Sequence, residues 1–115
     1  MQIPKPSEAD KTRFRSLVPD DAGVEVKPMF GNLGAFVNGN MFMGLFGADI
    51  GLKLARADLD QLARVAGSGP FGPAERPMGG YLSLPVALIG TADADRWVRQ
   101  ALAYVAGLPP KKASR

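Results

Sequence analysis

Few residues of this chain have the chemistry for catalysis, and their spacing does not bring them together. The 115 residues contain no histidine and no cysteine, which excludes the common zinc sites, histidine-assisted nucleophiles and thiolate mechanisms. Asp58 and Asp60 lie two positions apart on a predicted helix and do not face each other. Asp93 and Asp95 lie at a predicted helix start, where negative charge is favourable without any catalytic role. We therefore predict that the protein is not an enzyme and has no catalytic, cofactor-binding or metal-binding residues.

Two other patterns match functional sites in residue type, but their predicted structural surroundings do not favour that function. Residues 67–72 spell GSGPFG and match the GxGxxG dinucleotide fingerprint, but a predicted helix precedes them and Pro70 interrupts them. The fingerprint needs a strand before it and a helix opening through it. Ser83 could pair with Lys53 as a nucleophile if their strands were neighbours. We expect both side chains to point to solvent instead.

Methionine and aromatic residues are concentrated in the segment 24–55, where we expect four strands. The strand over 41–46 is apolar at nearly every position. Its side chains are predicted to alternate, with Met41, Met43 and Leu45 on one face and Phe42 and Phe46 on the other. Such a strand should face water on neither side.

The second apolar face needs a cover of its own, because one layer of helices covers only one face of a sheet. A second copy of the chain or another protein partner would cover it, or it would form a pocket lined by flexible methionine and aromatic side chains. We favour self-association over a ligand pocket. The predicted interaction residues are Met29, Phe30, Phe42 and Phe46.

Local signals place the elements that carry these residues. Ser7 and Asp10 form a variant capping box that begins a helix, and Pro19 ends it. Asn38-Gly39 predicts a type I′ hairpin turn, because both central positions of that turn need positive φ. A four-residue turn is expected at 31–34. The expected strands cover 24–27, 35–37, 41–46, 51–54 and 81–86.

Two further helices complete the pattern. Asp58 is expected to cap one of them and Gly67 to end it, and either Thr91 or Asp93 caps the other. Phe71 should tuck into the core and hold the intervening loop. The order α-β-β-β-β-α-β-α predicts an α+β fold of two layers, with helices packed on an antiparallel five-stranded sheet. We expect an extended lead-in over 1–6, a single domain over 7–106, and a basic, mobile tail over 107–115.

The net charge of +3 is located in the tail. Without Lys111, Lys112 and Arg115, the chain carries as many acidic as basic residues. These three cations could contact phosphates and give weak, salt-sensitive nucleic-acid binding, but a solubilising tail explains them more simply. No apolar run has the length of a membrane span, and the N-terminus lacks the apolar core of a signal peptide. We therefore expect a cytoplasmic protein that does not bind membranes.

The segment with the most methionine and aromatic residues also resembles a known family. Lys27-Pro28-Met29-Phe30-Gly31, then Gly34 and Phe36, are similar to the N-terminal domain of the bacterial TfoX/Sxy competence regulators. The similarity extends over roughly 7–106. Further matching residues are Asn38-Gly39-Asn40-Met41-Phe42, Leu52-Lys53-Leu54, Phe71, Tyr81, Pro85 and Trp97. The resemblance implies a two-layer α+β domain in a stand-alone form, without the helical C-terminal domain of the long members.

The resemblance also implies a role in transcription regulation. Long members of the family work with a cyclic-AMP receptor type activator to switch on DNA-uptake genes, and the resemblance carries over no catalytic residue. We therefore predict a non-enzymatic regulatory module that binds a protein partner or a second copy of itself. The alternatives are a weak nucleic-acid binder, or a small-molecule binder or enzyme that uses the open sheet face.

Overall fold

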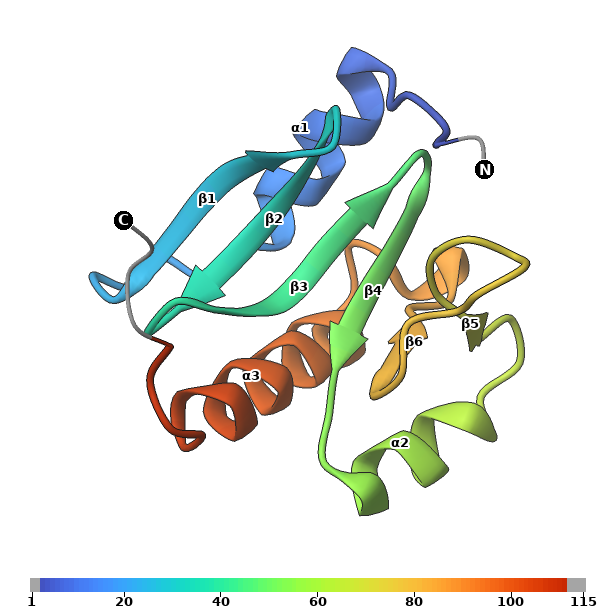
Figure 1. Ribbon diagram of the computed structural model, residues 1–115. Coiled ribbons are helices and arrows are strands. Elements are labelled where there is room, and N and C mark those ends of the chain that lie inside the picture. The colour runs from blue at the N-terminus through green and yellow to red at the C-terminus, as the bar shows by residue number, and fades with distance from the viewer. Residues whose placement is uncertain (1–2, 112–115) are drawn as a thin grey trace.

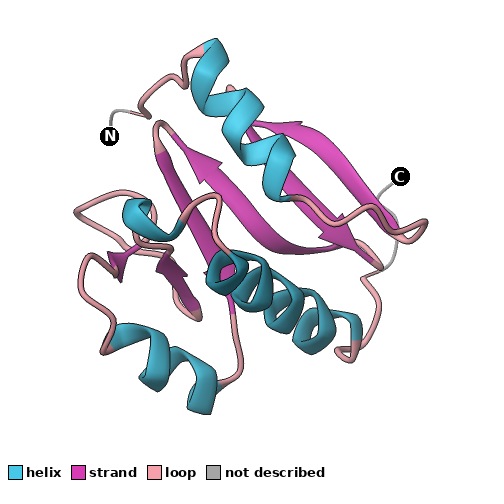
Figure 2. Ribbon diagram, turned by 180° about the vertical axis from the view of Figure 1, so that it is seen from behind, coloured by secondary structure: helices cyan, strands magenta, loops and turns pink. Residues whose placement is uncertain are grey.

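One antiparallel sheet forms one layer of the protein, and helices α1 (Glu8–Leu17) and α3 (Ala92–Ala106) pack on one face of it, behind the sheet in Figure 1 and in front of it in Figure 2. The computed structural model describes residues 3–111. The strands are β1 (Val24–Met29), β2 (Asn32–Val37), β3 (Asn40–Phe46), β4 (Asp49–Lys53), β5 (Gly69–Pro70) and β6 (Tyr81–Ser83). They lie in the order β1-β2-β3-β4-β6-β5. The predicted α+β class and antiparallel sheet are confirmed, and the short β5 adds a sixth strand to the five expected.

The helices are α1 (Glu8–Leu17), α2 (Arg56–Ala63) and α3 (Ala92–Ala106), with a 3-10 turn, η1, at Val86–Leu88. Figure 2 shows α1 and α3 in front of the same face of the sheet. The predicted capping box of α1 is confirmed, since Ser7 Oγ accepts from the Asp10 N–H at 3.0 Å and Asp10 Oδ2 accepts from the Ser7 N–H at 2.8 Å. Thr91 caps α3 through its side chain. Both helices therefore start where the sequence predicts.

The main core lies between the sheet and these helices. Phe14 of α1 and Ala101 of α3 are fully buried there, and Trp97 is 4% exposed. From the sheet come Leu33, Ala35, Val37, Phe42, Met43, Leu45, Ile50 and Leu52, and the residues just after β4 and β6 add Leu54 and Leu84. Leu62 joins the same cluster from α2. The buried residues of α3 recur at helical spacing and form an apolar stripe on its core-facing side: Ala94, Trp97, Val98, Ala101 and Val105.

The two tight hairpin turns at the ends of β2 have the same backbone form. Asn38 and Gly39 both have positive φ, 54° and 81°, as the type I′ prediction requires. Phe30 and Gly31 have φ of 50° and 81°, so they form a two-residue turn of the same kind. The expected four-residue turn at 31–34 is wrong, because residues 32–34 already belong to β2. The sequence does not predict this turn, because its first position is a bulky aromatic residue and such residues rarely have positive φ.

Several expected boundaries need correction. Helix α2 begins at Arg56 after Ala55, with no side-chain cap, so Asp58 lies inside its first turn. The helix ends at Ala63, well before Gly67. Strand β6 stops at Ser83, because Pro85 leads the chain into η1 instead of continuing the ladder.

Strand β1 is an edge strand, which is how it accommodates Pro28 in the ladder. Pro28 lies opposite Leu33 of β2. The middle of β1 faces solvent, and Val26 is 39% exposed. The alternating pattern of β1 therefore does not bury Val26 as a half-buried strand would.

Two asparagines, at the starts of β2 and β3, form hydrogen bonds to the segments near the N-terminus and the C-terminus of the chain. Asn32 Nδ2 donates to the Pro4 carbonyl at 3.1 Å, and Asn40 Nδ2 donates to the Pro109 carbonyl at 3.0 Å. The Lys111 N–H also donates to the Asn38 carbonyl at 2.8 Å. The segment 107–111 therefore lies against the β2–β3 turn, and the rest of the predicted basic tail lies outside the described residues.

Candidate functional site

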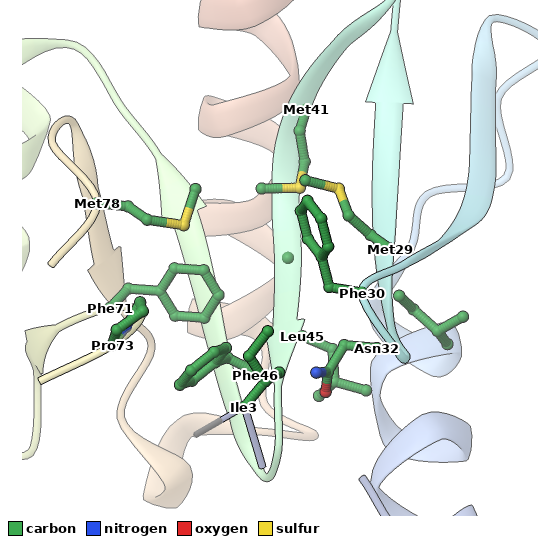
Figure 3. Close-up of a pocket in the computed structure, with 12 residues that line it drawn as sticks. Ile3, Met29, Phe30, Asn32, Met41, Leu45, Phe46, Phe71, Pro73 and Met78 are labelled. Carbon is green, nitrogen blue, oxygen red and sulfur yellow. The ribbon is translucent and has the colours of Figure 1, made fainter. Parts of the chain in front are cut away.

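A pocket of about 310 Å³ opens on the sheet face that α1 and α3 do not cover (Figure 3). Its floor is the surface of the sheet around β3. The turn between β1 and β2 forms one wall, and the loop 71–80 forms the opposite wall (Figure 3). The side chains that shape it are Met29, Phe30, Met41, Phe46, Phe71 and Met78, with Ile3 at one side.

Three glycines lie opposite one another on neighbouring strands, so no side chain rises from the sheet at this part of the pocket floor. Gly34 lies opposite Gly44, and Gly44 lies opposite Gly51. A Cβ atom at Gly44 would lie 3.1 Å from Met41 Cε and 3.2 Å from Phe71 Cζ. Glycine inside strands often marks a place where another group approaches the backbone closely. Here the three glycines leave room for the side chains of Met41 and Phe71 to pack flat against the sheet.

A β-bulge decides which side chains of β3 face the pocket. Ala35 pairs with Met43 and Phe36 pairs with Met41, so Phe42 is an extra residue without a partner on β2. Strict alternation is broken at this point. Met41 and Phe46 line the pocket, whereas Phe42 and Met43 are both fully buried in the core. The predicted alternation, with Met41 beside Met43 and Phe42 beside Phe46, is therefore wrong.

Phe30 stands on the rim of the pocket. Its ring extends from the β1–β2 turn toward the Met41 side chain (Figure 3). The residue is 78% exposed, the largest exposure among the apolar residues that line the pocket. Its φ of 50° lies in the left-handed region, which a bulky side chain rarely occupies. Phe30 thus combines an exposed apolar surface with a strained backbone.

Asn32 is the one residue with a polar side chain in the lining, and its amide is already used. The residue is only 4% exposed. Its Oδ1 accepts from the Gly47 N–H at 2.8 Å, and its Nδ2 donates to the Pro4 carbonyl. These bonds join β2 to the β3–β4 turn and fix the segment that carries Ile3. Sequence reasoning placed Asn32 in a turn and missed it, because a buried amide has no local signature.

A family comparison matches the TfoX N-terminal domain over residues 16–105 of the chain. The chain belongs to the TfoX N-terminal domain family. The match contains every pocket residue except Ile3. Comparisons with curated proteins and with solved structures gave no match. The pocket is therefore built almost entirely from the TfoX domain itself.

Polar groups on the outer face of this TfoX domain are engaged in structural contacts. Tyr81 Oη donates to the Met41 carbonyl at 2.8 Å, and burial raises the pKa of Tyr81 to about 12. Ser83 Oγ donates to the Pro70 carbonyl at 3.1 Å. Lys53 Nζ lies 5.7 Å from the centre of the Tyr81 ring. Strands β4 and β6 are indeed neighbours, but Ser83 lies opposite Gly51 rather than Lys53.

Residues 3–111 contain no cluster of three or more acidic residues that could hold a metal ion. Within this same range, no helix is long and apolar enough to cross a membrane.

Three of the four predicted interaction residues come together in the TfoX domain. Met29, Phe30 and Phe46 line the pocket, whereas Phe42 lies in the core behind the sheet because of the bulge. Of the predicted phosphate contacts, Lys111 is exposed at the C-terminal segment. Lys112 and Arg115 lie outside the described residues.

Proposed function

We propose that this TfoX domain is a non-enzymatic regulatory module of the cytoplasm that binds a protein partner, or a second copy of itself, through the open face of its sheet. The observation that carries the proposal is Phe30, an aromatic residue that is 78% exposed beside an apolar pocket. Exposed aromatic side chains next to concave apolar surface are typical of the residues that dominate protein interfaces.

The chemistry of the pocket supports a binding role over a catalytic one. Its lining contains no acid, base or nucleophile, and its single side-chain amide is bonded to Gly47 and Pro4. Tyr81, whose hydroxyl donates to the carbonyl of the pocket residue Met41, has its pKa raised by burial to about 12, still further from neutral pH than that of an ordinary tyrosine. A general acid or base works best with a pKa near the working pH. We therefore assign the face to recognition.

The family supplies the regulatory part of the proposal. The resemblance to competence regulators implies a partner among transcription activators of the cyclic-AMP receptor type. Met29 and Phe46, beside Phe30, provide the apolar surface for such a contact.

Light scattering and co-purification from the native host test this proposal. The wild-type chain should form a dimer or retain a protein partner, and Phe30→Asn should lose that species because it removes the exposed ring. Val86→Asn is the matched control, since Val86 is 70% exposed but lies outside the pocket. A strictly monomeric wild type that retains no protein, or complexes that survive Phe30→Asn, would refute the proposal.

A further inference from the structure

We propose that the pocket binds a small, uncharged, apolar molecule, and that Phe30 closes over this molecule as a clamp. The inference goes beyond the proposed partner binding and does not rest on it.

The pocket has the size and the enclosure of a small-molecule site. Its volume of about 310 Å³ falls at the lower end of the range of small-molecule sites, about 300–1,000 Å³. Four separate segments surround it: the sheet, the β1–β2 turn, the loop that carries Phe71 and Met78, and the N-terminal segment at Ile3 (Figure 3). A hollow with walls from so many segments can surround a small molecule on several sides.

The lining of the pocket favours an uncharged ligand. No charged side chain faces the pocket, and Asn32 is committed to Pro4 and Gly47. A charged ligand would lose its hydration there without gaining a partner. The methionines Met29, Met41 and Met78 have flexible, polarizable side chains that adapt to irregular apolar shapes. The site therefore selects an uncharged apolar ligand by chemistry rather than by a specific hydrogen bond.

The backbone of Phe30 is strained without any benefit to the fold. The next hairpin of the chain has the residues that this type of turn favours, because Asn38-Gly39 adopts the same positive-φ geometry. Asparagine at position 30 would serve folding better than phenylalanine. Strain of this kind is found at ligand clamps and other functional positions. Phe30 gains nothing for the core, since most of its ring is exposed, so we assign its role to the ligand.

The uncovered apolar surface of the open face has a limited extent. Lysine side chains cover the aromatic rings elsewhere on the outer face: Lys27 Nζ lies 5.0 Å from the Phe36 ring centre, and Lys53 lies over Tyr81. The uncovered apolar surface of the face is thus concentrated at the pocket. A stable protein interface buries about 800 Å² on each partner, so a protein seated here would also have to cover these lysines.

Fluorescence titration and methionine methyl NMR on the full chain test the proposal together. The probe is N-phenyl-1-naphthylamine, an uncharged apolar dye, with octanol as a competitor. Binding should saturate at one dye per chain, and octanol should displace the dye. The methyl signals of Met29, Met41 and Met78 should shift, while Met43, which is buried in the core, should stay in place and act as the internal control.

Two variants give the expected losses. Phe30→Asn should weaken dye binding about fivefold or more, and Met78→Lys should abolish it by placing a charge in the wall. Val86→Asn should bind the dye as the wild type does, and urea unfolding verifies that each variant is folded. Non-saturable binding, equal shifts at Met43, or unchanged affinity in folded Phe30→Asn would overturn the proposal. Pocket methionine shifts that depend on protein concentration and that the dye does not alter would also overturn it, because a second copy would then fill the pocket itself.

Discussion

The ring of Phe71 lies on Gly51, in the space that a Cβ atom at position 51 would fill. The same ring lies against Gly44, the cross-strand partner of Gly51. Phe71 is 2% exposed, and it also contacts Phe46 edge-on, with 6.3 Å between the ring centres. The loop 71–80 thus reaches the sheet only because two facing positions lack side chains. One wall of the pocket depends on this contact.

Gly51→Ala should therefore destabilise the protein by about 1–3 kcal/mol, the usual range for forcing an extra group into a packed site. The new methyl group must displace the Phe71 ring, because its carbon would overlap the ring atoms Cγ, Cδ1 and Cδ2. Urea unfolding measures the loss. Gly79→Ala is the matched control, because no atom lies within 4 Å of its added Cβ. Equal stability of the two variants would show that Phe71 moves away at no cost.

Phe30→Asn should stabilise the protein by about 1 kcal/mol, because a left-handed backbone costs a bulky residue about 1–2 kcal/mol that asparagine largely avoids. Little packing is lost, since the ring is mostly exposed. Thermal unfolding of the ligand-free protein measures the change. Val86→Asn again controls for the loss of exposed apolar surface. A destabilised Phe30→Asn would mean that the ring supports the fold.

Asn32→Ala should cost about 2 kcal/mol, because it leaves the Gly47 N–H without its partner in a buried place. Asn40→Ala is a close control. It also removes an amide bonded to a proline carbonyl, that of Pro109, but at an exposed position. Its cost should stay below about 1 kcal/mol. Hydrogen exchange at the Gly47 amide should accelerate in Asn32→Ala alone; unchanged exchange would contradict the role given to Asn32.

Asp10→Asn should lose stability in a pH-dependent way. Hydrogen bonds, first from the Ser7 N–H and then with the Ser7 side chain, hold the pKa of Asp10 below its ordinary value. A carboxylate with a lowered folded pKa stabilises the protein above its unfolded pKa, and this contribution disappears as pH falls through the folded pKa. The gap between wild type and variant should therefore be widest near neutral pH and close below about pH 4.

Thermal unfolding of both proteins from neutral to acid pH measures this gap. Glu8→Gln removes one charge from the same helical turn without touching the bond to Ser7, so it controls for net charge. A gap that stays constant with pH would contradict the assignment.

The structural features that are determined by residues close together in the sequence were predictable. The Ser7 and Asp10 capping box, the Asn38-Gly39 turn and the apolar stripe of α3 each arise within a few residues of one another. Their energetics are local, so propensity and periodicity suffice. Met29, Phe30 and Phe46 line one pocket, but their role as interaction residues stays a prediction.

Features that depend on distant contacts were not predictable. The bulge at Phe42 changes the face of every β3 residue on one side of it, and nothing in the local sequence marks it. The pocket needs Phe71 and Met78 to return onto the sheet, and the contacts of Phe71 with Gly51 and Gly44 join residues that are far apart in the sequence. The turn at Phe30-Gly31 was not predictable from the sequence. Two-residue turns of this type favour asparagine, aspartate or glycine at the first position, and phenylalanine is not one of these.

The attachment of Pro4 to Asn32 affects how the molecule should be handled. Ile3 forms part of the pocket edge, so an affinity tag placed before residue 1 would start within a few residues of the opening and could occupy it. The segment that ends at Lys111 is held at the Asn38-Gly39 turn, at the opposite end of β2 from Phe30. A tag at the C-terminus leaves the pocket clear, and surface immobilisation through that end would present the open face of the sheet to solution.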